Sequence, residues 1–514
     1  MEEYVWIVYF GGIFSFIASM GIGANDVANS FATSVGAKSL SIKQAVILAC
    51  IFETGGAILM GSHVSETIRK GIADYECFQD EPYTLMYGCM WVCFSVASWL
   101  FTASYLEMPV STTHSCIGGM IGMTIAIKGG DCVIWYKQKD TFPYAGGVLG
   151  MVLSWFISPI LSGLISSCLY SIIRLTILRK KYEDKNIYYC FPVLVSITML
   201  LNSFFIFYKG SKGIGLDDTS VEIVVGISFG IAIFSGLFTL PFLPKIYNYI
   251  ENNRTITNND NVINNYDVTN NDIVHIDNIN DDDNIQNEEE NNYNITDTKA
   301  QCYKIIDINS FAIIDKNDKD IHIINELNKN AEHFDVRTED FFKYLQIFSA
   351  SCAAFSHGAN DVANAIGPFA AILTIYWEGD VRKNSVMDNN AYWILSLGGV
   401  GISIGLLLYG YKIIRAIGIK LCKITPSRGT VIELSAALVT IFGSRLKIPL
   451  STTHCQVGAT CGIGLLESSW DKNVKGINKN IVYKTVFGWL ITCIFVGIIT
   501  GLLTAQGIYA PSVK

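Results

Sequence analysis

Charged residues are scarce in this sequence and unevenly distributed. Asp, Glu, Lys and Arg make up only 16% of the 514 residues, whereas they form about 25% of an average soluble protein. Twelve of the acidic residues lie between residues 251 and 300, so the rest of the chain has still less charge to keep a surface hydrated. This scarcity excludes a soluble globular enzyme, a nucleic-acid-binding protein and a disordered scaffold. It predicts a protein that crosses the lipid bilayer several times.

The sequence also lacks the cysteine and N-terminal patterns of secreted or metal-binding domains. Its 14 cysteines include no C-x-x-C pair and no Cys/His spacing suited to a metal, which argues against a zinc module or a disulfide scaffold. The first residues, Met-Glu-Glu-Tyr, carry negative charge before the first apolar stretch. A secretory signal begins with positive charge, so we expect this stretch to be a retained membrane span.

Long apolar segments fill most of the remaining sequence. A bilayer core about 30 Å thick needs roughly 20 apolar residues per helix. Two of the candidate segments, 110–128 and 450–467, are short enough for either to be half of a re-entrant pair. The twelve candidates are 4–35, 42–68, 85–106, 110–128, 145–174, 188–208, 220–245, 342–375, 391–411, 429–446, 450–467 and 484–508.

A polar segment separates the seventh candidate span from the eighth. Residues 251–300 contain sixteen asparagines and no proline, and such a composition buries too little apolar surface to offset the entropy cost of ordering. We therefore predict a first membrane half at 1–245, a mostly disordered loop at 246–341 and a second membrane half at 342–514.

Two polar motifs occur once in each half, in the same order. Residues 23–29 read GANDVAN and recur unchanged at 358–364, while the P-x-STTH of 109–114 recurs at 449–454. Each second copy is displaced by seven candidate spans, and an odd displacement reverses its direction through the membrane. The sequence thus predicts an all-α polytopic membrane protein with about 12 transmembrane helices or helical hairpins in two inverted-topology repeats, as in secondary transporters. A count of ten or eleven spans would remove the inversion.

Basic residues concentrate in three of the connections between spans. Residues 174–187, 412–428 and 470–484 each carry four or five Lys or Arg residues. Because such residues favour the cytoplasmic side, we expect both termini outside the cell, the long loop in the cytoplasm and the protein in the plasma membrane. The same orientation puts Cys77 and Cys132 outside, where they form either a disulfide or two free thiols.

The GANDVAN motif places polar groups where a bilayer disfavours them. Asp26 and Asp361 each interrupt an apolar segment, and an ionised carboxylate is costly there unless it faces a cavity or a partner. The neighbouring glycines favour helix breaks, which free backbone carbonyls to bind ions. Amide and carboxylate oxygens suit sodium or another small hard cation; the alternative is that they only cap a kinked helix. The candidate sodium ligands are Asn25, Asp26, Asn29, Asn360, Asp361 and Asn364.

The P-x-STTH motif predicts the start of a helix. Ser and Thr after a proline are typical of N-caps, and a helix N-terminus offers unpaired N–H groups and partial positive charge to an anion. The alternative is an ordinary cap at the membrane boundary. We interpret His114 and His454 as hydrogen-bonded packing groups rather than as groups that set the protonation of the anion. The candidate anion ligands are Ser111, Thr112, Thr113, Ser451, Thr452 and Thr453.

The two motifs together suggest coupled transport. Like charges about 5 Å apart repel by roughly 3 kcal/mol per pair at an effective dielectric near 20. The anion should therefore bind well only with cations between it and the carboxylates of Asp26 and Asp361. Such interdependence is the physical basis of symport.

These motifs resemble those of the inorganic phosphate transporter (PiT) family, whose eukaryotic members are mostly sodium–phosphate symporters. The resemblance rests on both GANDVAN copies, both P-x-STTH copies and the ETIRKG of 66–71, and it covers 5–245 and 342–508. It implies inorganic phosphate as the substrate, bound between the repeats with sodium ions beside it as co-substrate. We expect no enzymatic activity and no separate cofactor. The oligomeric state stays open, a homodimer included.

Two membrane glutamates depart from the symmetry of the repeats. When the halves are matched on their motifs, Glu53 aligns with Ile402 and Glu433 aligns with Cys93. We treat both glutamates as candidates for ion coupling, and their asymmetry leaves the number of coupled ions open. His357 belongs to the second half alone, so we do not count it as a site residue.

Other functions fit the sequence less well. An intramembrane hydrolase would use the Ser, His and Asp that are present, but the hydroxyls and His114 are contiguous and no G-x-S-x-G elbow occurs. A channel or cation exchanger would need a denser acidic pathway. Proton coupling, and transport of sulfate or arsenate, remain alternatives within the symporter class. The sequence therefore predicts sodium-coupled symport of inorganic phosphate by alternating access.

Overall fold

The protein is almost entirely helical over the residues that the computed structural model describes. These residues are 2–61, 71–138, 140, 144–180, 183–209, 220–252, 321–381, 392–445, 450–470 and 476–510. Their only sheet is an antiparallel ribbon of β1 (Lys137–Gln138) and β2 (Ala145–Gly146). Helices satisfy their own backbone hydrogen bonds, which a segment inside a bilayer requires.

The helices occur in the following order along the chain. In the first half they are α1 (Val5–Ile22), α2 (Ala28–Gly36), α3 (Ile42–Met60), α5 (Pro82–Tyr105), α6 (Thr112–Lys128), α7 (Gly147–Ile173), α8 (Glu183–Lys209) and α9 (Val221–Thr239). Later in the chain they are α12 (Ile321–Asn330), α13 (Val336–Glu378), α14 (Tyr392–Gly418), α15 (Pro426–Arg445), α16 (Thr452–Trp470) and α17 (Lys479–Tyr509). The short elements are the π-helical η2 (Gly23–Val27) and η5 (Arg174–Leu178) and the 3-10 turns η1 (Glu2–Tyr4), η3 (Tyr75–Phe78), η4 (Gly130–Cys132) and η7 (Leu240–Phe242).

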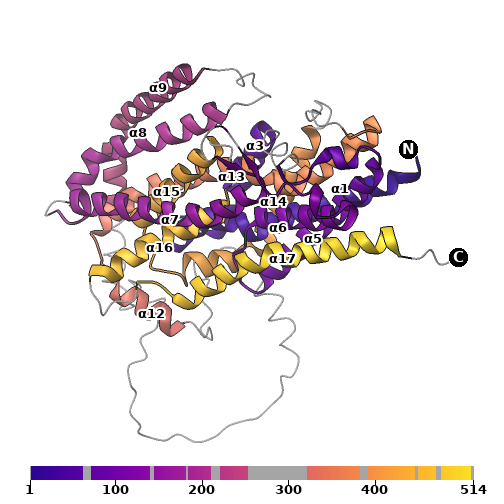
Figure 1. Ribbon diagram of the computed structural model, residues 1–514. Helices are drawn as coiled ribbons and strands as arrows, with labels where there is room; N and C mark the ends of the chain where they lie inside the picture. The colour runs from indigo at the N-terminus through magenta and orange to yellow at the C-terminus, as the bar shows by residue number, and fades with distance from the viewer. Residues whose placement is uncertain are drawn as a thin grey trace, which may run out of the picture.

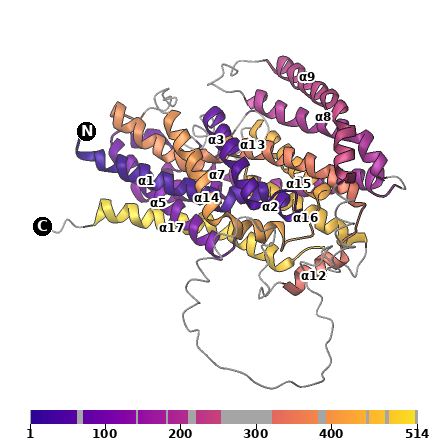
Figure 2. The same cartoon turned by 180° about the vertical axis from the view of Figure 1, so that it is seen from behind.

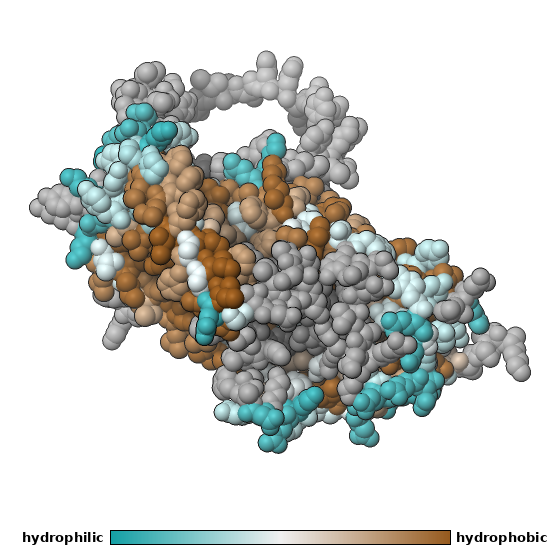
Figure 3. Space-filling model, turned by 90° about the horizontal axis from the view of Figure 1, so that it is seen from above, coloured by the Kyte–Doolittle hydropathy of each residue, from teal (hydrophilic) through white to brown (hydrophobic). Residues whose placement is uncertain are grey.

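The long helices run roughly along one direction and form a single bundle (Figure 1). The two chain termini lie at the same end of this bundle, and α8 and α9 pack side by side at its edge in both views (Figures 1 and 2). Seen from above, apolar side chains cover a broad area of the surface, and hydrophilic ones gather towards its ends (Figure 3). This distribution fits a bundle with lipid around its sides and water at its ends.

Each of the twelve predicted spans overlaps a helix in the described part of the chain, and eight helices there are long and apolar enough to cross a membrane. The protein is therefore a multi-pass membrane protein. The four predicted spans outside these eight are α6, α13, α15 and α16, which carry many buried polar side chains. Such helices contact other helices rather than lipid, so their hydropathy is lower. The count of twelve spans and the inverted topology stay predictions.

Glycines of the GANDVAN motifs let neighbouring helices approach to backbone contact. A Cβ added to Gly23 would lie 1.8 Å from the carbonyl oxygen of Ile402 in α14, and one added to Gly358 would lie 2.1 Å from that of Glu53 in α3. Glu53 and Ile402 are the two residues that the sequence comparison of the halves aligned with each other. The expected helix break is wrong for the second copy, because α13 continues through it without interruption. The first copy forms the π-helical η2 instead.

The ends of the predicted disordered loop are helical. Helix α12 lies within the 246–341 segment and buries Ile324 and Leu327, while α13 begins at Val336, before the predicted start of the second half. The amphipathic spacing of these apolar residues was masked by the polar composition around them. Residues 253–320 of the loop, and 62–70 of the ETIRKG region, lie outside the described residues.

A disulfide and a charged cluster join parts of the chain that are distant in sequence. Cys77 and Cys132 form a disulfide, the first of the two alternatives left open by the sequence. Between α12 and α13, Glu332 pairs with Arg174 and with Arg179, the latter at 2.7 Å. Burial alone would raise the pKa of Glu332, but the hydrogen bonds from the two arginines outweigh it and hold the pKa below its ordinary value.

Candidate functional site

The two copies of each motif occupy the centre of the bundle. The first GANDVAN forms η2 and the start of α2, and the second lies within α13. Both Ser-Thr-Thr runs begin helices as predicted. Ser111 accepts the N–H of His114 at 3.3 Å at the start of α6, and Ser451 accepts the N–H of His454 at 3.4 Å at the start of α16.

Asp26 receives hydroxyl groups from both halves of the chain. Thr112 donates to one of its carboxylate oxygens at 2.8 Å, and Thr453 donates to the other. The carboxylate is 1% exposed, so these hydroxyls replace water around it. The structure therefore joins the GANDVAN and P-x-STTH motifs, which the sequence could only place separately.

Asp361 has a matching set of partners. Thr452 donates to it at 3.0 Å, and Asn364 donates to it at 2.9 Å. Asn364 also donates to the hydroxyl of Thr112 at 3.0 Å and contacts that of Thr113 at 3.4 Å. One continuous hydrogen-bond network thus links both aspartates to both helix starts.

The other predicted amides have different surroundings. Asn25 donates to the carbonyl of Met108 at 3.0 Å and accepts the N–H of Val110 at 2.9 Å. It therefore fixes the segment that leads into α6. Asn360 is half-buried and contacts Asp361 at 3.5 Å. Asn29 lies in α2, and its side chain is outside the described part of the structure.

His357, which the sequence interpretation set aside, lies among three carboxylates. Its Nδ1 is 3.1 Å from Glu53, and its Nε2 is 3.0 Å from Asp361 and 3.8 Å from Asp26. The sequence did contain a signal, because His357 precedes Asp361 by four residues and such residues share a helix face. The first half has Ile22 at the equivalent position, so a search for residues repeated in both halves did not select His357.

The two asymmetric glutamates are held in different ways. Glu53 contacts the imidazole of His357, whereas Glu433 is surrounded by neutral donors. Thr33 donates to Glu433 at 2.7 Å and Ser34 at 3.1 Å, and Ser349 donates to its second oxygen. Glu433 therefore offers a second buried, oxygen-rich position that joins the two halves.

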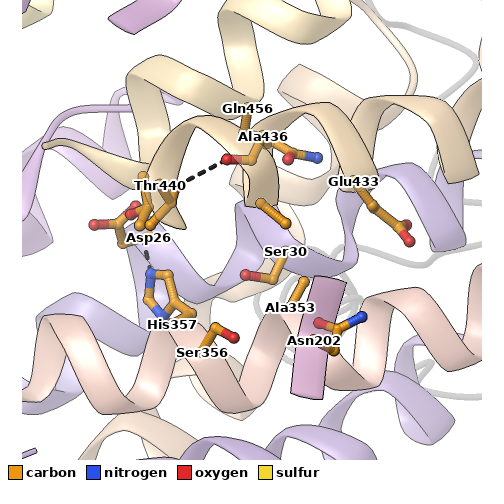
Figure 4. Close-up of a pocket in the computed structure, with 12 residues that line it drawn as sticks. Asp26, Ser30, Asn202, Ala353, Ser356, His357, Glu433, Ala436, Thr440 and Gln456 are labelled. Carbon is orange, nitrogen blue, oxygen red and sulfur yellow. Dashed lines mark hydrogen bonds and ion pairs between the residues drawn. The ribbon is translucent and has the colours of Figure 1, made fainter. Parts of the chain in front are cut away.

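A cavity connects the position of Asp26 and His357 with that of Glu433. Asp26, His357 and Thr452 line it together with Ser30 and Glu433. In the close-up, Asp26 and His357 point toward one another at one end, and Glu433 lies at the other (Figure 4). Carboxylate and hydroxyl oxygens along one cavity suit a small hard cation.

The serines at the two helix starts are not arranged as hydrolytic nucleophiles. The hydroxyl of Ser111 caps α6, and the ring of His114 faces the carbonyl of Trp489 at 3.3 Å instead of this hydroxyl. A serine nucleophile needs a base within hydrogen-bond reach. Among the described residues, neither Ser111 nor Ser451 has a histidine ring as its hydrogen-bond partner.

Comparisons with known proteins identify relatives of this chain. The phosphate transporter family matches residues 22–500. The phosphate-repressible phosphate permease pho-4 of Neurospora crassa is 30% identical, with 99% of each chain covered. A sodium-dependent phosphate transporter of Plasmodium falciparum is 29% identical over 99% of this chain and 98% of its own.

A solved structure supports the same assignment. The structure titled "The sodium-dependent phosphate transporter" superposes with a TM-score of 0.71 and 28% identity, covering 98% of this chain and 100% of the other. The resemblance inferred from the two duplicated motifs is thus confirmed by matches along nearly the whole chain. This protein belongs to the phosphate transporter family.

Proposed function

We propose that the protein carries inorganic phosphate across a membrane together with sodium ions, by alternating access to one central site. The observation that carries this proposal is the network between Asp26, Thr112 and Thr453. A cation at the aspartates and an anion at the helix starts would share these hydroxyls. Sodium is a co-substrate here, and the protein needs no separate cofactor.

The coupling follows from charge. Phosphate at the starts of α6 and α16 would lie beside the carboxylates of Asp26 and Asp361, which repel it in a poorly screened interior. Sodium ions between them would convert this repulsion into attraction. Each ligand then binds well only when the other is present, which is the thermodynamic requirement for symport.

Reciprocal contacts support an inverted pair of repeats around this site. Thr112 bonds to Asp26 as Thr452 bonds to Asp361. In the same way, Gly23 lies against the backbone of α14, and Gly358 lies against the backbone of α3. Such matched contacts are expected when two copies of one unit face each other across an axis. Movement of the halves about this axis would expose the site to each side in turn.

One observation favours proton coupling as the second candidate. The Nδ1 atom of His357 lies 3.1 Å from a carboxylate oxygen of Glu53. Its Nε2 atom lies 3.0 Å from a carboxylate oxygen of Asp361, and a neutral imidazole has only one N–H, so these two contacts call for a second proton on the ring or on a carboxylate. Loss of that second proton during transport would couple phosphate to protons through residues that the first half does not duplicate.

The cellular placement is part of the same proposal. We propose the plasma membrane, with both termini outside and the long loop in the cytoplasm, because the basic connections then face inward. A homodimer is compatible with the lipid-facing surface of the bundle.

The test is uptake of radiolabelled phosphate into proteoliposomes, with an inward sodium gradient compared with equimolar choline at fixed pH. We expect sodium-dependent uptake by the unmodified chain. Thr112→Val and Thr453→Val should each abolish most of it. The matched controls are Thr124→Val and Thr460→Val, because these hydroxyls lie in the same two helices but bond only to their own backbone.

Three outcomes separate the alternatives. Uptake that ignores sodium but follows a pH gradient would replace sodium with protons and implicate His357 and Glu53. Equal activity in Thr112→Val and Thr124→Val would refute the shared-hydroxyl site. Absence of phosphate uptake under either gradient would refute the proposal that phosphate is the substrate.

A further inference from the structure

Four aromatic side chains form a closed cluster directly behind the Ser-Thr-Thr runs. We call the cluster of His114, Trp155, His454 and Trp489 the histidine–tryptophan box. The two histidines are each 1% exposed, and their rings lie 4.5 Å apart between centroids. Both come from the first turn of a helix whose start carries the proposed phosphate ligands.

Each histidine donates a hydrogen bond to a neighbouring helix. His114 Nδ1 lies 3.3 Å from the carbonyl oxygen of Trp489 in α17, and His454 Nδ1 lies 3.0 Å from that of Trp155 in α7. A carbonyl only accepts, so the proton must be on Nδ1 in both rings. The Nε2 atoms have no partner among the described residues.

Each histidine also stacks on the tryptophan that it does not bond. The His114 ring lies 3.7 Å from the Trp155 ring, and the His454 ring lies 3.7 Å from the Trp489 ring, again between centroids. The hydrogen bonds therefore join α6 to α17 and α16 to α7. The stacked rings join these two helix pairs to each other.

The helix pairs themselves are held at backbone contact. Glycines four residues apart in α6 and in α16 face the backbone of the partner helix, so neither pair can slide without a clash. The added Cβ distances are 2.2 Å for Gly118 to Cys493, 2.0 Å for Gly122 to Gly497, 2.3 Å for Gly458 to Pro159 and 2.2 Å for Gly462 to Gly163. The box is thus an aromatic junction between two closely packed units.

We infer that His114 and His454 are positioning residues that set the distance and angle between the two helix starts. This inference rests on the proposed function, because it assigns both starts to a single phosphate ion. A small tetrahedral anion can contact both starts only at one separation, and polar ligands misplaced by about 1 Å lose most of their effect. The structure therefore assigns phosphate affinity partly to side chains that do not touch phosphate.

The experiment compares three replacements of His454 in sodium-driven proteoliposomes. Asn places an N–H near the position of Nδ1 and should keep the bond to Trp155, whereas Gln reaches the position of Nε2 and Leu has no donor. Loss of a buried hydrogen bond corresponds to about a tenfold change in affinity. We expect the KM for phosphate to rise about tenfold in His454→Leu and His454→Gln. It should rise clearly less in His454→Asn.

The maximal rate separates positioning from folding. Poorly folded protein lowers the number of active transporters and hence the maximal rate, but it leaves KM unchanged. His114→Leu and His114→Asn should reproduce the His454 results, and His333→Leu, at an exposed histidine outside the box, should change neither constant.

An unchanged KM in both leucine variants, or equal rescue by Asn and Gln, would overturn this inference while the proposed function stood. Absence of phosphate uptake by the unmodified chain under either a sodium or a pH gradient would overturn the proposed function and the inference together. The preference for phosphate over arsenate provides a second test of the same geometry. A wider gap should favour arsenate, the larger tetrahedral anion, so the ratio of arsenate KM to phosphate KM should fall in His454→Leu.

Discussion

The glycine at the start of each GANDVAN motif offers a quantitative test of how the site is held. In Gly23→Ala, the new Cβ would lie 1.8 Å from the carbonyl oxygen of Ile402, so η2 and α14 would have to separate by about 1.7 Å to reach an ordinary contact near 3.5 Å. The obstacle is backbone, which cannot rotate away. Overpacking of this kind costs about 1–3 kcal/mol, while the better helix propensity of Ala returns about 1 kcal/mol or less. We expect a net destabilisation of about 1–2 kcal/mol.

The chain contains a matched control. An alanine at Gly226, in α9, has no heavy atom of the described residues within 4 Å of its Cβ, apart from its own local helix. Gly226→Ala should therefore be neutral or stabilise the protein by up to about 1 kcal/mol. Thermal unfolding in detergent should lower the midpoint for Gly23→Ala and leave or raise it for Gly226→Ala.

Transport should respond more strongly than stability. Gly23 lies three residues before Asp26, so the displacement that relieves the clash also moves the carboxylate away from Thr112 and Thr453. We expect initial sodium-driven phosphate uptake to fall at least about tenfold, since misplacements of about 1 Å have effects of this size. Equal stability and equal uptake in Gly23→Ala and Gly226→Ala would refute the close helix contact and the argument built on it.

Three further predictions follow from the same contacts. Asp26→Asn and Asp361→Asn should each lose cation-dependent uptake because an amide cannot balance a sodium ion; normal sodium dependence in both would remove the coupling argument. Glu332→Gln should lower thermal stability at neutral pH, and because the pKa of Glu332 is lowered in the folded protein, the difference from wild type should shrink as the pH falls through the acid range; a difference that grows with acidity would contradict the ion pairs. After reduction, Cys77 and Cys132 should react with an impermeant maleimide added outside intact cells and be identified by mass spectrometry; labelling only from the inside would reverse the proposed orientation.

The sequence by itself determined the class of the protein and pointed to most residues of the candidate site. Scarce charge and long apolar runs require a helical membrane protein, because a bilayer accepts little else. Exact repetition of GANDVAN and P-x-STTH singled out Asp26, Asp361 and the two hydroxyl runs, since buried polar groups are too costly to occur twice without a use. These inferences needed only local chemistry and spacing.

Tertiary structure decided which of these groups meet. Thr453 bonds to Asp26 across 427 residues, and no local pattern encodes a contact of that range. His357 became a site residue only because α3 brings Glu53 to it, and Asn25 was found to hold the segment before α6 rather than to stand free. The aromatic junction behind the site likewise depends on four helices that meet only in the folded bundle. Sequence patterns report the period and polarity of single helices, while the partners of each side chain are set by how those helices pack.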